Sequence, residues 1–123
     1  MAKTILVVDD SASLRTVVRM ALNRAGYEVL EAGDGAQALG VLEAAPKVHL
    51  IISDVNMPNM DGITFVKEVK KLANYKFTPI IMLTTEGQES KKQEGQAAGV
   101  KAWVLKPFQP QQMLDAVAKL ALP

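Results

Sequence analysis

The segment of residues 50–62 constrains the fold more than any other part of the sequence. It opens with a run of branched apolar residues, which predicts a strand that is buried on both faces. The strand ends at the carboxylate of Asp54, and Pro58 and Gly62 prevent it from continuing. Ligand sites of open α/β sheets form where such strands open into loops. Taken alone, Asp54 is better explained as a loop-capping residue, so the other strand ends must decide its role.

Apolar runs and helical patterns alternate along the chain. Strands are expected at residues 4–8, 27–32, 49–53, 79–83 and 101–105. Helices are expected at residues 14–25, 36–45, 63–72, 87–98 and 110–120. This alternation predicts the α/β class, with one doubly wound parallel sheet covered by helices on both faces. Residues 1–123 are expected to form a single domain without an output domain.

Composition narrows the class of protein. A chain of 123 residues with 49% hydrophobic and 22% charged residues is typical of a globular protein with one core. A net charge of +1 gives no support for a nucleic-acid or membrane surface. The absence of cysteine excludes disulfides and thiolate metal sites. The apolar start is too short for a signal peptide, so a cytoplasmic protein is expected.

The helix expected at residues 87–98 differs from the others because it is almost entirely polar. It contains Gly95, and it offers mainly Ala97 and Ala98 to a core. A helix with such a narrow apolar face is weakly held by packing. We therefore expect it to open more easily than its neighbours.

Polar side chains follow four of the five expected strands. Asp9 and Asp10 come after the first strand, Asp54 after the third, Thr84 after the fourth and Lys106 after the fifth. The second strand contributes nothing comparable. Because parallel strands place their carboxyl ends on one edge of the sheet, these side chains are expected to converge there.

A convergence of this kind predicts phosphoryl-transfer chemistry. Three neighbouring carboxylates repel one another, and a divalent cation removes that cost. Mg²⁺ prefers oxygen ligands and retained waters, which an open acidic cluster supplies. With Lys106 as a point charge and Thr84 as a hydroxyl donor, one carboxylate becomes a nucleophile that forms an aspartyl phosphate. Each residue also has an ordinary explanation as a cap, a strand end or a loop lysine, and only their combination favours a site.

Four motifs make the chain similar to a known family. They are the acidic pair at residues 8–10 and the segments at residues 54–62, 82–86 and 106–108. Together they resemble the receiver domain of two-component response regulators, in particular the stand-alone chemotaxis regulators, over essentially the full length. The resemblance implies a flavodoxin-like sheet of strand order 2-1-3-4-5.

The resemblance also implies roles for the acidic residues. Asp54 is expected to be the phosphoacceptor. Asp10 and Asp54 are expected to bind Mg²⁺ directly together with the backbone carbonyl of Asn56, and Asp9 is expected to act through water. The phosphoryl donor implied by the family is a CheA-like histidine kinase.

Further positions belong to the phosphorylated state of the family. Lys106 is expected to contact the phosphoryl oxygens, and Thr84 to move toward them. Trp103 falls at a switch position where the family usually has Tyr or Phe, and its larger ring and buried N–H would hinder inward rotation. The alternative is a partly exposed ring that covers the sheet edge. Thr85 is also larger than the residue usual there, which would narrow access to the phosphoryl group.

The expected function is a single-domain phosphorylation switch that acts as a monomer. It is not expected to be an enzyme that turns over a substrate and releases a product. Its downstream partner is expected to be a flagellar motor switch protein or another protein, with a dedicated phosphatase as a further partner. Gln88 and Glu89 stand where motor binders tend to carry lysines, which leaves a phosphorelay or a phosphate sink as the alternative. His49, on the wrong edge of the sheet, is not expected to carry a phosphoryl group. An aspartate-nucleophile phosphatase and a flavodoxin-like flavin carrier are remoter alternatives.

Overall fold

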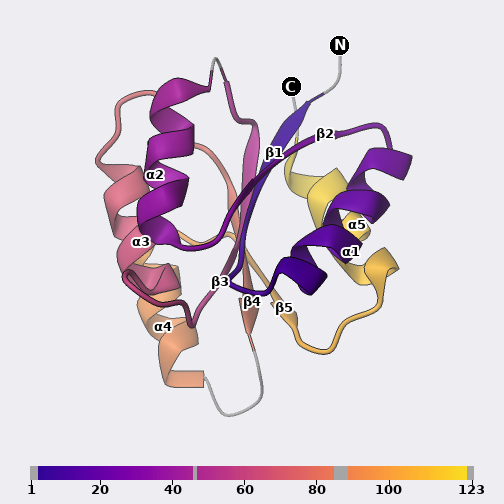
Figure 1. Ribbon diagram of the computed structural model, residues 1–123. Helices are drawn as coiled ribbons and strands as arrows, with labels where there is room; N and C mark the ends of the chain where they lie inside the picture. Colours follow the sequence, from indigo (N-terminus) through magenta and orange to yellow (C-terminus); the bar gives the residue numbers. More distant parts are fainter. Residues whose placement is uncertain (1–2, 46, 85–88, 122–123) are drawn as a thin grey trace.

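The computed structural model describes residues 3–45, 47–84 and 89–121 (Figure 1). Its centre is a parallel sheet of strand order β2-β1-β3-β4-β5, which confirms the predicted fold. The strands are β1 (Thr4–Val8), β2 (Glu28–Ala32), β3 (Leu50–Asp54), β4 (Ile80–Thr84) and β5 (Ala102–Leu105). Parallel register places the ends of β1 and β3 side by side, with Val8 opposite Ser53.

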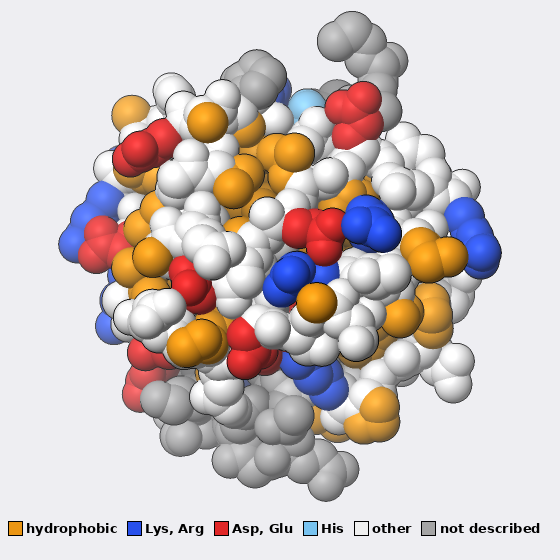
Figure 2. Space-filling view, in the orientation of Figure 1, with side chains coloured by type: hydrophobic (Ala, Val, Ile, Leu, Met, Phe, Trp, Pro, Cys, Tyr) orange, Lys and Arg blue, Asp and Glu red, His pale blue; other side chains and the backbone are white. Residues whose placement is uncertain are grey.

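Helices cover the sheet on both faces. They are α1 (Ala12–Arg24), α2 (Gly35–Ala44), α3 (Gly62–Lys70), α4 (Glu89–Ala98) and α5 (Pro110–Leu120). Helices α2, α3 and α4 lie on one face and α1 and α5 on the other (Figure 1). Among the described residues, no helix combines the length and the apolar character that a membrane span needs. In the face shown in Figure 2, acidic and basic side chains are interspersed.

Side-chain caps explain where the helices start. The Ser11 hydroxyl accepts the N–H of Leu14 at 3.2 Å, and α1 begins one residue later at Ala12. Asp34 and Asp61 cap α2 and α3 in the same way. At the other end of α1, Gly26 has φ +95°, a left-handed conformation that glycine adopts without a steric cost.

The core has one layer on each face of the sheet. Successive residues of a strand point to opposite faces, so the two layers take alternate residues. Leu6, Ile51 and Met82 belong to the layer under α2, α3 and α4, whereas Ile5 and Ile52 belong to the layer under α1 and α5. Every residue of β3 is buried, including Ser53 and Asp54. The apolar run that predicted a doubly covered strand is therefore the middle of the molecule.

Helix α4 corrects the expectation made for its apolar face. Ala98 is half-buried and packs against the core as expected, but Ala97 is exposed and Gly95 is buried instead. The helix turns Gly95 toward the sheet because the side chain of Trp103 occupies the space beside it. Residues 85–88 lie outside the described part of the chain, and with them the expectations for Thr85 and Gln88.

Candidate functional site

Three carboxylates meet where β1 and β3 end. Asp9 and Asp10 directly follow β1, and Asp54 is the last residue of β3. Each of the three offers an oxygen that lies within 4.8 Å of the other two. Asp9 is 1% exposed and Asp54 is 9% exposed, whereas Asp10 faces solvent. The predicted convergence of these residues is therefore present.

Lys106 lies between the two buried carboxylates. Its Nζ is 3.1 Å from Asp9 Oδ2 and 3.2 Å from Asp54 Oδ2, and its side chain is 21% exposed. The lysine that the sequence placed after the fifth strand is thus a fixed counter-charge and not a solvated loop residue. A buried ion pair of this kind needs good geometry to offset the desolvation of both partners.

Backbone N–H groups fix the other oxygen of each buried carboxylate. Val55 N–H donates to Asp54 Oδ1 at 2.8 Å, and Ser11 N–H donates to Asp9 Oδ1 at 2.9 Å. Each carboxylate therefore has one oxygen on the backbone and the other on Lys106. The Oδ2 atoms of Asp9 and Asp54 therefore both point toward the ammonium group of Lys106.

Burial and charge shift the proton affinities of this cluster. Burial raises the pKa of Asp54, the neighbouring Asp9 charge raises it further, and Lys106 opposes both. Burial lowers the pKa of Lys106, but the Asp54 charge and the hydrogen bond to Asp9 outweigh it, so this pKa stands above its usual value. The ammonium therefore stays charged, and the carboxylates retain a repulsion that a further cation would relieve.

The donor set fits a hard divalent cation. All three side chains offer carboxylate oxygens, and the exposed position of Asp10 leaves one side of the cluster open to water. Mg²⁺ favours few protein oxygens and several retained waters. Asn56, whose carbonyl the sequence assigned to the metal, lies exposed in the loop two residues beyond Asp54.

Thr84 and Lys106 are connected through the backbone. Thr84 ends β4 and is 9% exposed, and its carbonyl accepts the N–H of Lys106 at 2.5 Å. Because of this hydrogen bond, a movement of the Thr84 backbone would also move the backbone of Lys106. His49, in contrast, accepts the N–H of Thr4 at the opposite ends of the strands, where the sequence placed it.

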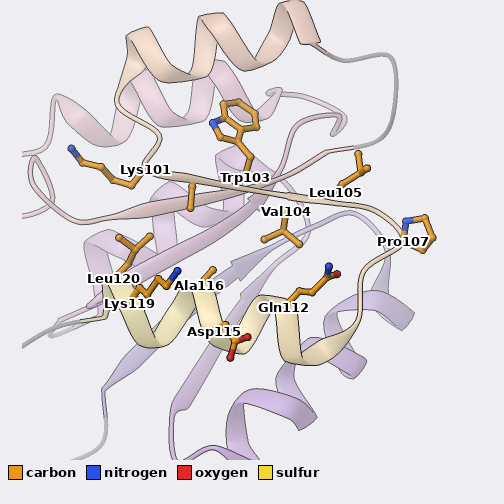
Figure 3. A pocket seen from close by; sticks show the side chains of 11 residues that line it. Lys101, Trp103, Val104, Leu105, Pro107, Gln112, Asp115, Ala116, Lys119 and Leu120 are labelled. Carbon is orange, nitrogen blue, oxygen red and sulfur yellow. The ribbon is translucent and has the colours of Figure 1, made fainter.

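Trp103 lies away from the carboxylates, on the α4 side of β5. Its half-buried ring packs against the core layer under α2, α3 and α4. Figure 3 shows the indole directed toward the helix above β5, whereas Val104 points toward α5. The ring thus lies inward in this structure while it stays partly exposed, and its role as a switch residue stays a prediction. Its N–H is buried and has no acceptor among the described residues.

Gly62 brings α3 against the back of Asp54. Its N–H donates to the Val55 carbonyl at 2.7 Å. A Cβ at this position would stand 2.1 Å from the backbone oxygen of Asp54. The turn that the sequence indicated at this point is therefore also a close approach that only glycine permits.

Two supporting contacts escaped the sequence analysis. Arg15 Nη1 donates to the Asp9 carbonyl at 2.5 Å, and its Nε lies 3.2 Å from Glu31, the residue before the end of β2. Asp34 is buried and accepts Asn59 Nδ2 at 2.8 Å, which ties the loop after Asp54 to the start of α2. Glu31 of the second strand thus supports Asp9 through Arg15, although this strand supplies no carboxylate of the cluster. The signal available was the Asp34-Gly35 turn, whose partner Asn59 is far along the chain.

The hydrogen bonds of Asp34 favour its charged form. The backbone N–H of Gln37, followed by the Asn59 amide, holds the pKa of Asp34 below its usual value. Asn59 itself has φ +69°, a conformation that Asn adopts more readily than most residues. The loop after Asp54 is thus anchored by an ionised group outside the metal cluster.

Comparison with known proteins agrees with this fold and this cluster. The sequence profile of the response regulator receiver domain matches residues 5–118, so the chain belongs to the response regulator receiver family. Within that family it is CheY-like. It is 44% identical over 108 residues to the chemotaxis protein CheY1 of Helicobacter pylori, covering 87% of each chain. It is 40% identical over 121 residues to CheY of Bacillus subtilis, covering 97% of this chain and 98% of the other.

A solved structure extends the similarity to the fold. CheY4 of Vibrio cholerae superposes with a TM-score of 0.92 at 48% sequence identity, over 98% of this chain and 99% of that one. A response regulator from Chloroflexus aurantiacus also superposes with a TM-score of 0.92, at 35% identity. The receiver fold is therefore shared with chains that differ from this one in most positions.

Proposed function

We propose that this chain is a phosphorylation switch in which Asp54 accepts a phosphoryl group from the phosphohistidine of a histidine kinase. The observation that carries the proposal is the position of Lys106, whose Nζ lies within 3.2 Å of both Asp9 and Asp54. Phosphoryl transfer depends chiefly on positioning and on neutralisation of charge. A buried carboxylate, a fixed ammonium and an oxygen-lined cation site provide both.

Asp54 is the group placed to attack phosphorus. In the transfer, a carboxylate oxygen of Asp54 bonds to phosphorus, the phosphorus–nitrogen bond of the donor breaks, and the electron pair leaves with the imidazole. Lys106 already contacts this carboxylate, so it remains within reach of the phosphoryl oxygens after the transfer. Mg²⁺ held by Asp10, Asp54 and the Asn56 carbonyl, with Asp9 acting through water, would neutralise those oxygens.

The regulated event in this proposal is a self-catalysed modification and not the turnover of a released substrate. Hydrolysis of the aspartyl phosphate by the chain itself returns the switch to its resting state. The phosphoryl group adds a charge of roughly −1.5 to −2 and three acceptor oxygens. The Thr84 hydroxyl at the neighbouring strand end is the donor that responds to them.

The surface that carries the signal is the side of the sheet at β5. A hollow of about 470 Å³ lies between β5 and α5, lined by Trp103, Leu105, Ala116 and Leu120 among others (Figure 3). Leu105 is 50% exposed there. Charged and polar residues, among them Lys101, Asp115 and Lys119, also line the hollow. A hollow of mixed character beside an edge strand suits a protein partner that offers both apolar and charged side chains, and α4 adjoins it through Trp103.

Chemotaxis is the setting that the relatives support. CheY1 of Helicobacter pylori and CheY of Bacillus subtilis are chemotaxis proteins that align along most of this chain. A CheA-like kinase is then the donor and a flagellar motor switch protein the partner. The alternative is a phosphorelay or phosphate sink; it rests on Gln88, which lies outside the described residues, and on Glu89, whose side chain does too.

Incubation of the purified protein with acetyl phosphate and Mg²⁺ tests the function. We expect intact-mass measurement to show one phosphoryl group per chain, with no further consumption of acetyl phosphate beyond slow autohydrolysis. Rapid, continuous release of phosphate would instead indicate an aspartate-nucleophile phosphatase. An unchanged mass at every Mg²⁺ concentration would contradict the proposal.

Mg²⁺ should stabilise the fold by relieving the carboxylate repulsion. We expect about 2.7 kcal/mol of added stability when free Mg²⁺ is about 100 times its dissociation constant. Thermal melts in Mg²⁺ and in chelator measure the difference. Asp10→Ala should largely remove it, whereas Asp115→Ala, which removes an exposed carboxylate of α5, should leave it unchanged. Equal melting temperatures with and without Mg²⁺ in the unmodified chain would argue against a metal site.

Thr84→Ala should separate phosphorylation from its effect on α4. Thr84 precedes the connection to α4 and is bonded to the residue after β5, so it joins the site to that surface. We expect phosphorylation of the unmodified chain to change hydrogen exchange in α4 and the emission of Trp103 together, and α1 to stay as it was. The variant should gain the phosphoryl mass without either change. Full responses in Thr84→Ala would rule out this route.

A further inference from the structure

Trp103 and Gly95 fit together in a way that neither residue predicts alone. A Cβ built on Gly95 would stand 2.3 Å from Cη2 and 2.5 Å from Cζ2 of Trp103. It would also lie 3.2 Å from Cδ1 of Ile63 in α3. The far edge of the indole therefore fills the space that the side chain of any residue other than glycine would occupy at position 95.

The helix has no local reason for a glycine at this point. Gly95 lies inside α4 and is buried, and glycine is one of the least favourable residues for a helix interior. Gly40 of α2 is a useful contrast, because a Cβ there would meet nothing within 4 Å. The space at Gly95 is thus occupied, whereas the space at Gly40 is empty.

The position of the indole leaves its N–H group without a hydrogen bond to any described residue. Its N–H is buried without an acceptor among the described residues, and a buried donor left unpaired is destabilising. Packing of the ring against Gly95, Ile63 and the core layer must offset that cost. The fit between the ring and the missing side chain is what makes such packing close enough.

We propose that Gly95 is a positioning residue of the switch. Because Gly95 has no side chain, α4 has a socket at this point in which the Trp103 ring packs before phosphorylation. The proposal rests on the phosphorylation switch described above and concerns its regulation. With the ring seated, β5 and α4 are joined by a large side chain. A shift that begins at Thr84 moves the helix and the ring as a unit, and the ring does not rotate between an outer and an inner position.

A double-mutant cycle tests the socket without any phosphorylation. Gly95→Ala should lower the melting temperature of the Trp103 protein by at least about 3 °C, because overpacking outweighs the gain in helix propensity. The same change should raise Trp103 quenching by acrylamide and shift its emission to the red. In a Trp103→Phe background, where the ring ends short of Gly95, it should raise the melting temperature by about 3 °C.

Gly40→Ala is the matched control for helix propensity. It should raise the melting temperature in both backgrounds and leave the quenching of Trp103 as it was, because nothing lies near its Cβ. A rise in melting temperature for Gly95→Ala in the Trp103 protein, with unchanged quenching, would overturn the socket.

Phosphorylation of the unmodified chain tests the second half of the proposal. After treatment with acetyl phosphate and Mg²⁺, with the mass gain verified, acrylamide quenching of Trp103 should stay as low as before. A marked rise in quenching would show that the ring leaves its seat and would overturn the fixed role. If the chain gains no phosphoryl mass, the proposed function fails, while the double-mutant cycle still decides the socket.

Discussion

Asp54→Asn should abolish phosphorylation from acetyl phosphate while the protein stays folded. Asp54 belongs to the carboxylate cluster, contacts Lys106 and ends the central strand. An amide has the same shape but is a far weaker nucleophile, and its oxygen can still accept the N–H of Val55. Burial and the neighbouring Asp9 charge raise the pKa of Asp54, which means that both disfavour its ionised form. Because the change removes this unfavourably placed negative charge, we expect little loss of stability. Intact-mass measurement and thermal melting test both halves of the prediction.

Asp61→Asn is the matched control for that experiment. Asp61 lies in the same loop and caps α3, outside the carboxylate cluster. An asparagine cap serves a helix as well as an aspartate does, so this variant should fold and gain the full phosphoryl mass. A full mass gain in Asp54→Asn would assign the acceptor to another group, with Asp9 and Asp10 the next to be replaced.

The fold could be predicted because local signals and tertiary packing agree. Strands read from apolar runs match the observed strands to within one residue, as in the case of β3, whose last residue is Asp54 and not Ser53. Each run is bounded by turn or cap residues, such as Ser11 before α1 and Gly26 after it. Consistency of this kind between levels is what lets pattern alone indicate topology.

Helix α4 could not be predicted to the same depth. Its narrow apolar face does not specify how the helix is rotated about its axis, so the pattern favours Ala97 over Gly95 as a core residue. The rotation is set by Trp103, eight positions further along the chain and on a strand. The local pattern indicates only that Gly95 lowers the helix propensity, because its packing partner Trp103 lies on another element.

The carboxylates and Lys106 could be predicted to meet because parallel strands share an edge, a property of topology. The contacts that orient them could not, because they join side chains to distant backbone atoms. Arg15 on the Asp9 carbonyl and Asn59 on Asp34 are two such contacts. The chemical roles of Asp54 and Thr84 stay predictions that the variants described above test, and the role of Lys106 in contacting the phosphoryl group stays a prediction as well.

Gly62→Ala should be the most destabilising single-methyl change near the site. Its Cβ would stand 2.1 Å from the Asp54 backbone oxygen and 3.0 Å from the Val55 Cα, so the backbone itself must move. We expect a loss of about 3 kcal/mol or more in the free energy of unfolding, at the upper end of the usual cost of overpacking. Because the displaced atom belongs to the proposed acceptor residue, phosphorylation from acetyl phosphate should also slow. Denaturant unfolding and the rate of mass gain measure the two effects.

Gly35→Ala separates this close approach from the general cost of replacing a glycine. Gly35 is the first residue of α2, as Gly62 is of α3, and each follows an aspartate cap. A Cβ at Gly35 would meet the side chain of Met60, with its sulfur at 2.9 Å and its Cβ at 3.1 Å. A rotamer change can move the sulfur, and the Cβ contact needs only a small shift, whereas the 2.1 Å contact of Gly62 is with a backbone oxygen. We therefore expect Gly35→Ala to cost much less than Gly62→Ala and to leave the phosphorylation rate unchanged. Equal losses in the two variants would mean that α3 can move away from Asp54 freely, and that Gly62 does not fix the position of the acceptor.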